Sequence, residues 1–158
     1  MKSNQDLSGE VLIAIRRVIR AVDLHSKKLS QEYNLTGPQA LVLKEISVTK
    51  GITPGKLAKR VSLSQATITD IVKRLESRDC VKRIRGMDDR RKVVLEITSA
   101  GIKLIDTAPP LLQEKFTQRF NQLADWEQTL LLSSLQHVAS LMDADSLDAA
   151  PLLTSGAP

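Results

Sequence analysis

The side chains best suited to a specific chemistry are basic, and they are concentrated in one segment of the chain. Residues 56–92 hold twelve basic and five acidic side chains, a local charge of +7, whereas the rest of the 158-residue chain contributes −2 to the total of +5. A basic segment on a nearly neutral protein is typical of proteins that bind a polyanion such as nucleic acid. A solvated surface of mixed charge has the same composition, so the pattern of elements must distinguish the two.

Catalytic and metal-binding chemistry has little support in the sequence. The two histidines, His25 and His137, are far apart, and the single cysteine, Cys80, stands where an apolar core residue is expected. A metal site needs ligands that converge, and the sequence has no glycine-rich phosphate loop, Ser-His-Asp arrangement or nucleophile elbow. Asp88-Asp89 is followed at once by two arginines, which favours an ion pair over a catalytic carboxylate pair. We therefore expect no enzyme activity, no metal and no cofactor.

The composition, 42% hydrophobic and 26% charged, is that of a soluble globular protein. No stretch approaches the roughly 18 uninterrupted apolar residues of a membrane span, and the N-terminal segment does not resemble a secretory signal. A single cysteine allows no internal disulfide, which fits a reducing cytoplasm. Aromatic residues make up only 3%, which argues against stacking platforms for single-stranded nucleic acid.

Two short helices are predicted within the basic segment. Thr53-Pro54 is typical of a helix start, so we expect a helix over residues 54–61. A three-residue connection leads to a second helix that runs to about Arg78, and either Ser62 or Ser64 can be its N-cap. Two short helices joined by such a turn form a helix-turn-helix, in which the second is the candidate recognition helix for a DNA major groove.

The candidate recognition helix has two distinct faces. Its apolar stripe consists of Ile68, Ile71, Val72 and Leu75. Its opposite face consists of Gln65, Ala66, Thr69, Asp70 and Lys73. Short polar side chains without large apolar ones suit the base edges of a major groove, although a solvated helix face is polar as well.

A β-hairpin is predicted directly after this helix. The hydrophobic period changes from 3.6 to 2, which predicts strands over residues 81–85 and 93–97. The charged segment 86–92 between them is too long for a tight turn. A hairpin in this position makes a winged helix, and Arg90 and Arg91 near its tip suit a minor groove, whose negative potential attracts arginine.

The segments before the basic region predict two more helices and a short strand. Apolar residues at steps of three and four predict a long helix over residues 8–33. Thr36 and Gln39 have the spacing of a capping box, which predicts the start of the next helix. Gly51 ends that helix, and Ile52 suits a short strand.

The segment after the wing predicts further helices. Thr98-Ser99 can cap a helix that breaks at Pro109-Pro110, and a second apolar segment follows. Asp125 can cap the last helix, which is strongly apolar. Residues 144–158 are rich in Ala, Asp, Ser and Pro, and we expect them to be disordered. The fold class is therefore mainly helical with a small β-wing.

This order of elements resembles the MarR family of bacterial transcription regulators over about residues 8–142. The resemblance is carried by Leu35-Thr36-Gly37-Pro38-Gln39, by Ser64-Gln65-Ala66-Thr67-Ile68-Thr69 with Arg74-Leu75-Glu76, and by residues 89–101. The last of these segments matches the wing pattern of the family, an Asp-x-Arg followed by an alternating strand that ends in Leu/Ile-Thr-x-x-Gly.

The resemblance implies an obligate homodimer that binds a palindromic operator on double-stranded DNA as a repressor, under the control of a small effector. It implies a dimerisation helix over 1–35, a winged helix over 36–98, dimerisation helices over 99–143 and a tail over 144–158. The terminal helices are more apolar than one chain can readily bury, which also favours a dimer. The implied location is the bacterial cytoplasm, on the nucleoid when bound.

Individual roles follow from the same resemblance. Arg91 would enter the minor groove, Asp89 would hold it by an ion pair, and Arg90 would meet phosphate, with Lys92 beside them. The residues that would face base edges are Gln65, Ala66, Thr69 and Asp70, and those that would position the DNA backbone are Ser64, Thr67 and Lys73.

Two departures from the family pattern leave questions open. Asp70 stands where many relatives carry a basic or neutral polar residue, so it would either accept a hydrogen bond from cytosine N4 or orient a neighbouring Lys or Arg. Asp79-Cys80 replaces the common Gly-apolar pair. Residues 18–26 together with 35–39 are similar to the branch that represses compatible-solute synthesis, such as ectoine or glycine betaine pathways, which would imply osmotic control. The alternative function is a winged-helix protein-interaction module without operator specificity.

Overall fold

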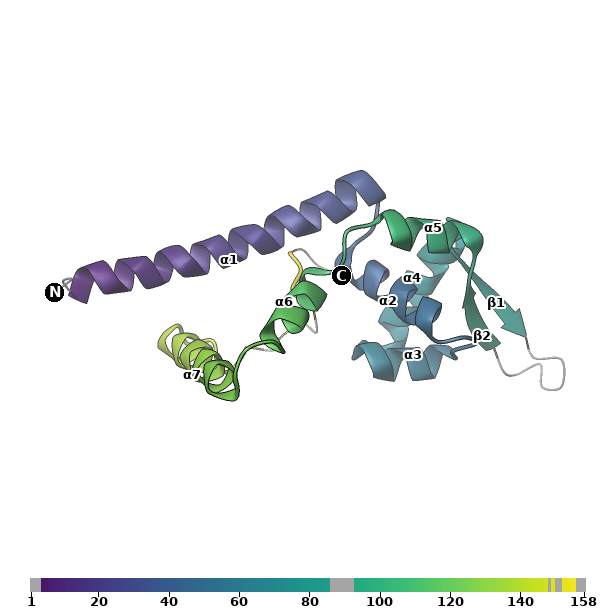
Figure 1. Ribbon diagram of the computed structural model, residues 1–158. Helices are drawn as coiled ribbons and strands as arrows, with labels where there is room; N and C mark the ends of the chain where they lie inside the picture. The colour runs from purple at the N-terminus through teal and green to yellow at the C-terminus, as the bar shows by residue number, and fades with distance from the viewer. Residues whose placement is uncertain (1–3, 86–92, 148, 150–151, 156–158) are drawn as a thin grey trace.

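The computed structural model describes residues 4–85, 93–147, 149 and 152–155, which form seven helices and one two-stranded sheet (Figure 1). The elements in chain order are α1 (Asn4–Tyr33), α2 (Gly37–Val48), α3 (Pro54–Val61), α4 (Gln65–Glu76), β1 (Val81–Arg85), β2 (Val93–Ile97), α5 (Ser99–Thr107), α6 (Leu112–Phe120) and α7 (Asp125–Leu141). The predicted fold class, mainly helical with a small β-wing, is confirmed.

A compact head is formed by α2, α3, α4, α5 and the sheet. Its core is one cluster of buried apolar side chains contributed by each helix of the helix-turn-helix and by both strands. The cluster includes Leu43 of α2, Leu57 of α3, Leu75 of α4 and Leu95 of β2, each fully buried. Burial of large apolar side chains is the main stabilising term for the head, at about 1.5–3 kcal/mol for each.

The start of α2 is the predicted capping box. The Thr36 N–H donates to the side-chain oxygen of Gln39 at 3.1 Å, and the Gln39 N–H donates to the Thr36 hydroxyl at 3.4 Å. Pro38 follows in the first turn, where its missing N–H costs nothing. The end of α1 therefore passes into α2 through a short, well-defined connection.

The turn between α3 and α4 decides between the two serines that can cap α4. Ser62 ends α3 in the left-handed conformation with φ 54°, whereas Ser64 is the N-cap of α4 and its hydroxyl accepts from the Thr67 N–H at 3.0 Å. Thr53 caps α3 before Pro54, as predicted. The helix-turn-helix is thus fixed at both helix starts by side-chain caps.

The sheet pairs β1 with β2 antiparallel, from Val81 opposite Ile97 to Arg85 opposite Val93. The short strand predicted at Ile52 is reduced to a single bridge, in which the Leu95 N–H donates to the Ile52 carbonyl at 2.8 Å. Residues 86–92, which include the predicted wing-tip residues Asp89, Arg90, Arg91 and Lys92, lie outside the described residues.

The remaining helices form an arm, which comprises α1, α6 and α7. In Figure 1, α1 extends far from the head, and α6 and α7 lie along the same side of the head as α1. The helix break predicted at Pro109-Pro110 separates α5 from α6. The predicted cap of the last helix is wrong by one residue: Ala124 is the N-cap, and the Glu127 carboxylate accepts from its N–H at 2.8 Å.

The arm leaves most of its apolar side chains exposed. Leu29 is the only fully described residue of α1 that is buried, and neither α6 nor α7 contains a buried residue. The large exposed apolar side chains of the arm are Leu7, Val11, Leu12, Ile13, Val18, Ile19, Leu24, Phe116, Trp126, Leu130, Leu131, Leu132, Leu135 and Leu141. Of the helices in the described part, none is both long and apolar enough to cross a membrane.

Candidate nucleic-acid interface

The predicted base-reading residues lie together on the exposed face of α4. Ile68, Ile71, Val72 and Leu75 are buried in the head, as the two-faced pattern predicted. The residues left in solvent on this helix and at its cap are Ser64, Gln65, Ala66, Thr69, Asp70, Lys73 and Arg74, and Thr67 is partly buried. The face is continuous because the helical period places residues three and four apart next to one another.

The first turn of α4 is organised by Ser64 and Thr67. The Ser64 hydroxyl accepts from the Thr67 N–H, and it lies 2.8 Å from the Thr67 hydroxyl. A capped helix start keeps further N–H groups directed outward, and these attract negative charge such as phosphate. The hydrogen bond to Ser64 therefore fixes the backbone of the turn that carries Gln65 and Ala66.

Thr69 and Asp70 differ in what they can still offer a ligand. The Thr69 hydroxyl donates to the Gln65 carbonyl at 2.8 Å, so its oxygen remains only as an acceptor. Asp70 lines a hollow of about 260 Å³ between the start of α2 and α4, together with Thr36 and Arg74. The two roles predicted for Asp70, a contact with cytosine and the orientation of a neighbouring cation, stay predictions.

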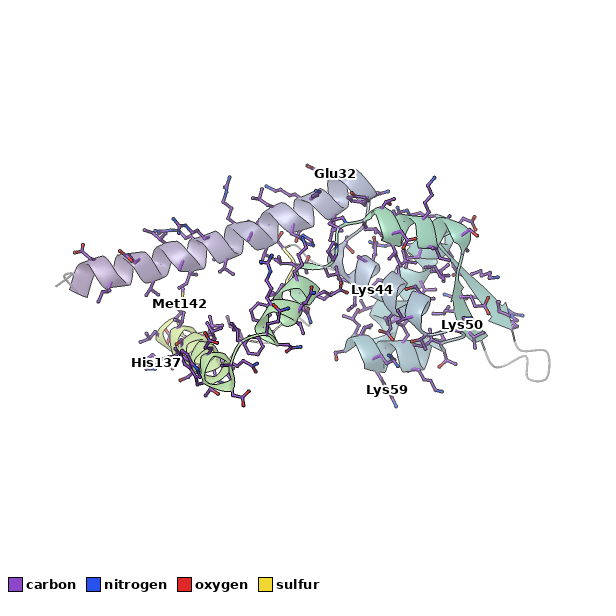
Figure 2. All side chains as sticks on the ribbon, viewed as in Figure 1. Glu32, Lys44, Lys50, Lys59, His137 and Met142 are labelled. Carbon is purple, nitrogen blue, oxygen red and sulfur yellow. The ribbon has the colours of Figure 1, made fainter. Side chains whose placement is uncertain are left out.

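Apart from Arg78, the cationic side chains around α4 fall into two groups. Three are held in ion pairs: Arg60 with Glu45, Arg83 with Glu76 at 3.0 Å, and Lys82 with Glu96 at 3.3 Å. Among the described residues of the basic segment, the basic side chains that form no ion pair or side-chain hydrogen bond with another described residue are those of Lys56, Lys59, Lys73, Arg74 and Arg85. The exposed cations of α3, α4 and β1 therefore have their charge available to a polyanion (Figure 2 labels Lys59).

One contact between distant segments, made by Arg78, was not predicted from the sequence. Arg78, just after α4, donates from Nη2 to the Tyr33 carbonyl at 3.1 Å and from Nη1 to the Asn34 carbonyl. These carbonyls belong to the end of α1, where Asn34 takes the left-handed conformation with φ 50°. Since the partners are 44 and 45 positions apart, no local sequence signal could have found the contact.

Cys80 is part of the core rather than a reactive group. Its side chain belongs to the buried cluster of the head, as expected for a packing residue. Burial raises the pKa of the Cys80 thiol, and the smaller opposing effect of Arg78 does not reverse this. The thiolate, which is the nucleophilic form, is therefore disfavoured near neutral pH.

A second hollow lies in the arm. It has a volume of about 370 Å³, and its walls are apolar side chains of α1, α6 and α7, including Val18, Phe116 and Leu131. Phe116 and Phe120 stack in it with ring centroids 5.4 Å apart, and Lys115 and Arg119 also contribute to its lining. In the described part of the chain, no cluster of three His, Cys, Asp or Glu side chains could hold a metal ion.

Comparison with known proteins agrees with this architecture. The family model "MarR family" matches residues 35–93. The multiple antibiotic resistance protein MarR of Escherichia coli K12 is 30% identical over 136 residues, which cover 82% of this chain and 94% of the relative.

Two solved structures extend the comparison. The PcaV transcriptional regulator of Streptomyces coelicolor, in complex with its natural ligand, is 25% identical with a TM-score of 0.57 and covers 90% of this chain and 99% of PcaV. The MepR–DNA complex of S. aureus is 18% identical with a TM-score of 0.59, covers 89% of this chain and 99% of MepR, and shows a shared fold.

Proposed function

The chain belongs to the MarR family, a family of transcriptional regulators and not of enzymes, and we propose that it binds double-stranded DNA through α4 and the wing. The observation that carries the proposal is the exposed face of α4, which is polar, flanked by unpaired cations and fixed by a cap at its N-terminal end. A helix presented in this way by a helix-turn-helix fits the major groove.

Within this interface, Gln65 and Ala66 read base edges from the first turn of α4. Glutamine can pair bidentately with adenine, and the alanine methyl can contact a thymine methyl. Ser64, Thr67 and Lys73 position the DNA backbone. Thr69 and Asp70 complete the reading face. In the wing, Arg91 enters the minor groove, held by Asp89, while Arg90 and Lys92 meet phosphate.

The protein acts as a homodimer on a palindromic operator. The exposed apolar side chains of α1, α6 and α7 support this proposal, because one chain leaves them in water and a second copy can cover them. Two-fold symmetry then presents two copies of α4 to major grooves about one helical turn, or roughly 34 Å, apart. Binding at such a site blocks transcription, and the regulator is a repressor.

A small effector or a change in ionic conditions modulates the repressor. The arm cavity of about 370 Å³ supports an effector with an apolar body, and Lys115 and Arg119 favour an anionic group on it. Osmotic control of compatible-solute synthesis belongs to this proposal. It predicts that operator affinity responds to a compatible solute or to ionic strength beyond the general effect of salt.

The experiment that tests DNA binding is a salt titration with fluorescent duplexes selected by the protein from a randomised library. Affinity should fall linearly with salt on logarithmic axes, because phosphate contacts release counterions. Lys73→Ala should reduce the slope by about 1, whereas Lys103→Ala, exposed on α5, should leave it unchanged. Arg91→Ala should cost about 1–3 kcal/mol of binding free energy. Recovery of no duplex, or affinity without salt dependence, would favour a protein-interaction module instead.

The dimer is tested by sedimentation of full-length variants. Leu135→Asp places a charge on the apolar surface of α7, where the side chain is 60% exposed in the single chain, and it should produce monomers. Val48→Asp makes the same kind of change at a 65% exposed position of the head and should leave the dimer intact. A wild-type protein that sediments as a monomer contradicts the dimer.

A further inference from the structure

The segment 152–155 contacts elements far from it in the chain. The Ser155 N–H donates to the Ser26 hydroxyl of α1 at 3.0 Å, and the Thr154 hydroxyl lies 3.3 Å from the same Ser26 oxygen. Thr154 also lies against the first residue of α2, since a Cβ placed on Gly37 would be 3.2 Å from the Thr154 hydroxyl. One short segment is therefore in contact with the arm and with the head at once.

The two leucines of the segment lie on different sides of α6. Leu152 is only 8% exposed and lines a hollow with Leu41 of α2 and with Leu111, Thr117 and other residues at the start and along one side of α6. Leu153 lines the arm cavity, which lies on the side of α6 that carries Phe116. The Thr154 N–H donates to the Leu152 carbonyl at 3.0 Å, so the chain turns at Leu153, and the two leucines reach hollows on opposite sides of α6.

The other contacts between the head and α6 in the described residues include Leu111, which is 7% exposed and lines the same hollow as Leu152. The link between α5 and α6 contains Pro109 and Pro110, which carry no N–H and end the helix. Lys44 of α2 and Glu114 of α6 form an ion pair at 2.6 Å, but the Lys44 side chain is 45% exposed, and such pairs contribute little (Figure 2 labels Lys44). Leu152 is therefore one of two buried leucines that attach the head to α6.

We propose that residues 152–155 form a strap that fixes the winged-helix head to the arm and thereby sets the affinity for duplex DNA. The inference rests on the proposed function, because the arm joins two heads that must reach two grooves at one spacing. When the strap is docked, the heads are held at that spacing before DNA arrives. When it is released, only a fraction of the molecules has the correct spacing, and the apparent affinity falls by that fraction.

The first test compares two full-length variants. One is expected to disrupt the docking of the strap, and the other makes the same kind of change at an exposed position. Leu152→Asp places a charge in the buried position, whereas Leu147→Asp changes a 70% exposed leucine five positions earlier. Leu152→Asp should raise the Kd for the selected duplex about three- to tenfold, as expected if the competent fraction falls to between a third and a tenth. Leu147→Asp should change it by less than about twofold.

The second test locks the strap. Ser26→Cys with Thr154→Cys, in a Cys80→Ala background, places two thiols where the native hydroxyl oxygens are 3.3 Å apart, so oxidation should join them. In a chain that also carries Leu152→Asp, the oxidised form should regain the affinity of the parent and the reduced form should lose it again. No disulfide under oxidation, or equal affinities of the two forms, would overturn the proposal.

Hydrogen exchange of α6 amides provides a readout that needs no DNA. Leu152→Asp should accelerate exchange over residues 112–120, and the disulfide should slow it. If the wild-type chain selects no duplex, the proposed function fails, and exchange in α6 still decides whether the strap holds the arm. Unchanged exchange after Leu152→Asp would overturn the strap itself.

Discussion

Arg78 holds the end of α1 through the Tyr33 carbonyl, to which its Nη2 donates at 3.1 Å. Because Arg78 follows the last turn of α4, the recognition helix and the arm are joined directly by one side chain. The last carbonyls of a helix lack partners within the helix, and a guanidinium can satisfy two of them from one position.

Replacing Arg78 should weaken this junction. Arg78→Ala removes two hydrogen bonds from a charged donor at a partly exposed site, and we expect a loss of about 1–2 kcal/mol in the free energy of unfolding. Arg78→Lys should lose nearly as much, since an ammonium group cannot match the fork. Urea unfolding at fixed protein concentration measures both variants. The control is Lys59→Ala, and a loss no larger than in this control would contradict the role of Arg78.

Gln65 should determine one position of the operator. Gln65→Ala should reduce the binding free energy for the preferred duplex by about 1–3 kcal/mol. It should also relax the base preference at a single base pair in each half-site. Selection from a randomised library with the variant and the wild type measures this directly. Gln31→Ala removes the same type of side chain from an exposed position of α1 and should leave the selected sequence unchanged. A selected sequence that keeps its preference in Gln65→Ala would remove Gln65 from base reading.

The secondary structure of the head could be predicted in detail because the sequence patterns that determine it are local. The capping box at Thr36 and Gln39, the cap-proline start at Thr53-Pro54 and the change of period at residue 81 each act within a few residues. The serine that caps α4 could not be chosen from sequence, since Ser62 and Ser64 both fit. The left-handed φ of Ser62 excludes it as the cap of α4 and makes it the end of α3.

Contacts between distant segments account for most of what the sequence did not reveal. Arg78 at the end of α1 and Leu152 beside α6 each join elements that no pattern relates. The cap of α7 was misplaced because Asp125 is a good N-cap type, whereas the Glu127 side chain fixes the start at Ala124 instead. The exposed face of α4 was predicted because burial follows helical period, but its contacts with DNA are not set by the chain alone.

Gly101 allows the wing to pack closely on α5. A Cβ at this position would collide with the Cys80 carbonyl and would lie 2.7 Å from Cγ1 of Ile97. Gly101→Ala should therefore destabilise the protein by about 1–3 kcal/mol, the usual cost of overpacking. At Gly55 a Cβ would meet only Nε2 of Gln65 at 3.6 Å, so Gly55→Ala should be neutral or stabilising by up to about 1 kcal/mol. Thermal unfolding measures the melting temperatures of the two variants. Equal melting temperatures would contradict the close approach of Gly101 to the Cys80 carbonyl.

Finally, His25 should make stability depend on pH below neutrality. Its Nε2 is buried and has no hydrogen-bond partner among the described residues. Burial lowers the pKa of His25 from the ordinary value near 6.5, with smaller contributions from Lys115 and Lys28. The unfolded chain therefore binds a proton at higher pH than the folded chain does. The stability due to neutral His25 is complete above about pH 6.5 and is lost as the pH falls toward the lowered pKa.

Urea unfolding at pH 7.5 and pH 5.5 measures this effect. His25→Gln should reduce the loss of stability between the two pH values, whereas His137→Gln, exposed on α7 and labelled in Figure 2, should not. The comparison between variants cancels every contribution to the pH dependence that the two proteins share. If His25→Gln loses as much stability on acidification as the wild type, the buried imidazole is not the group that responds to pH.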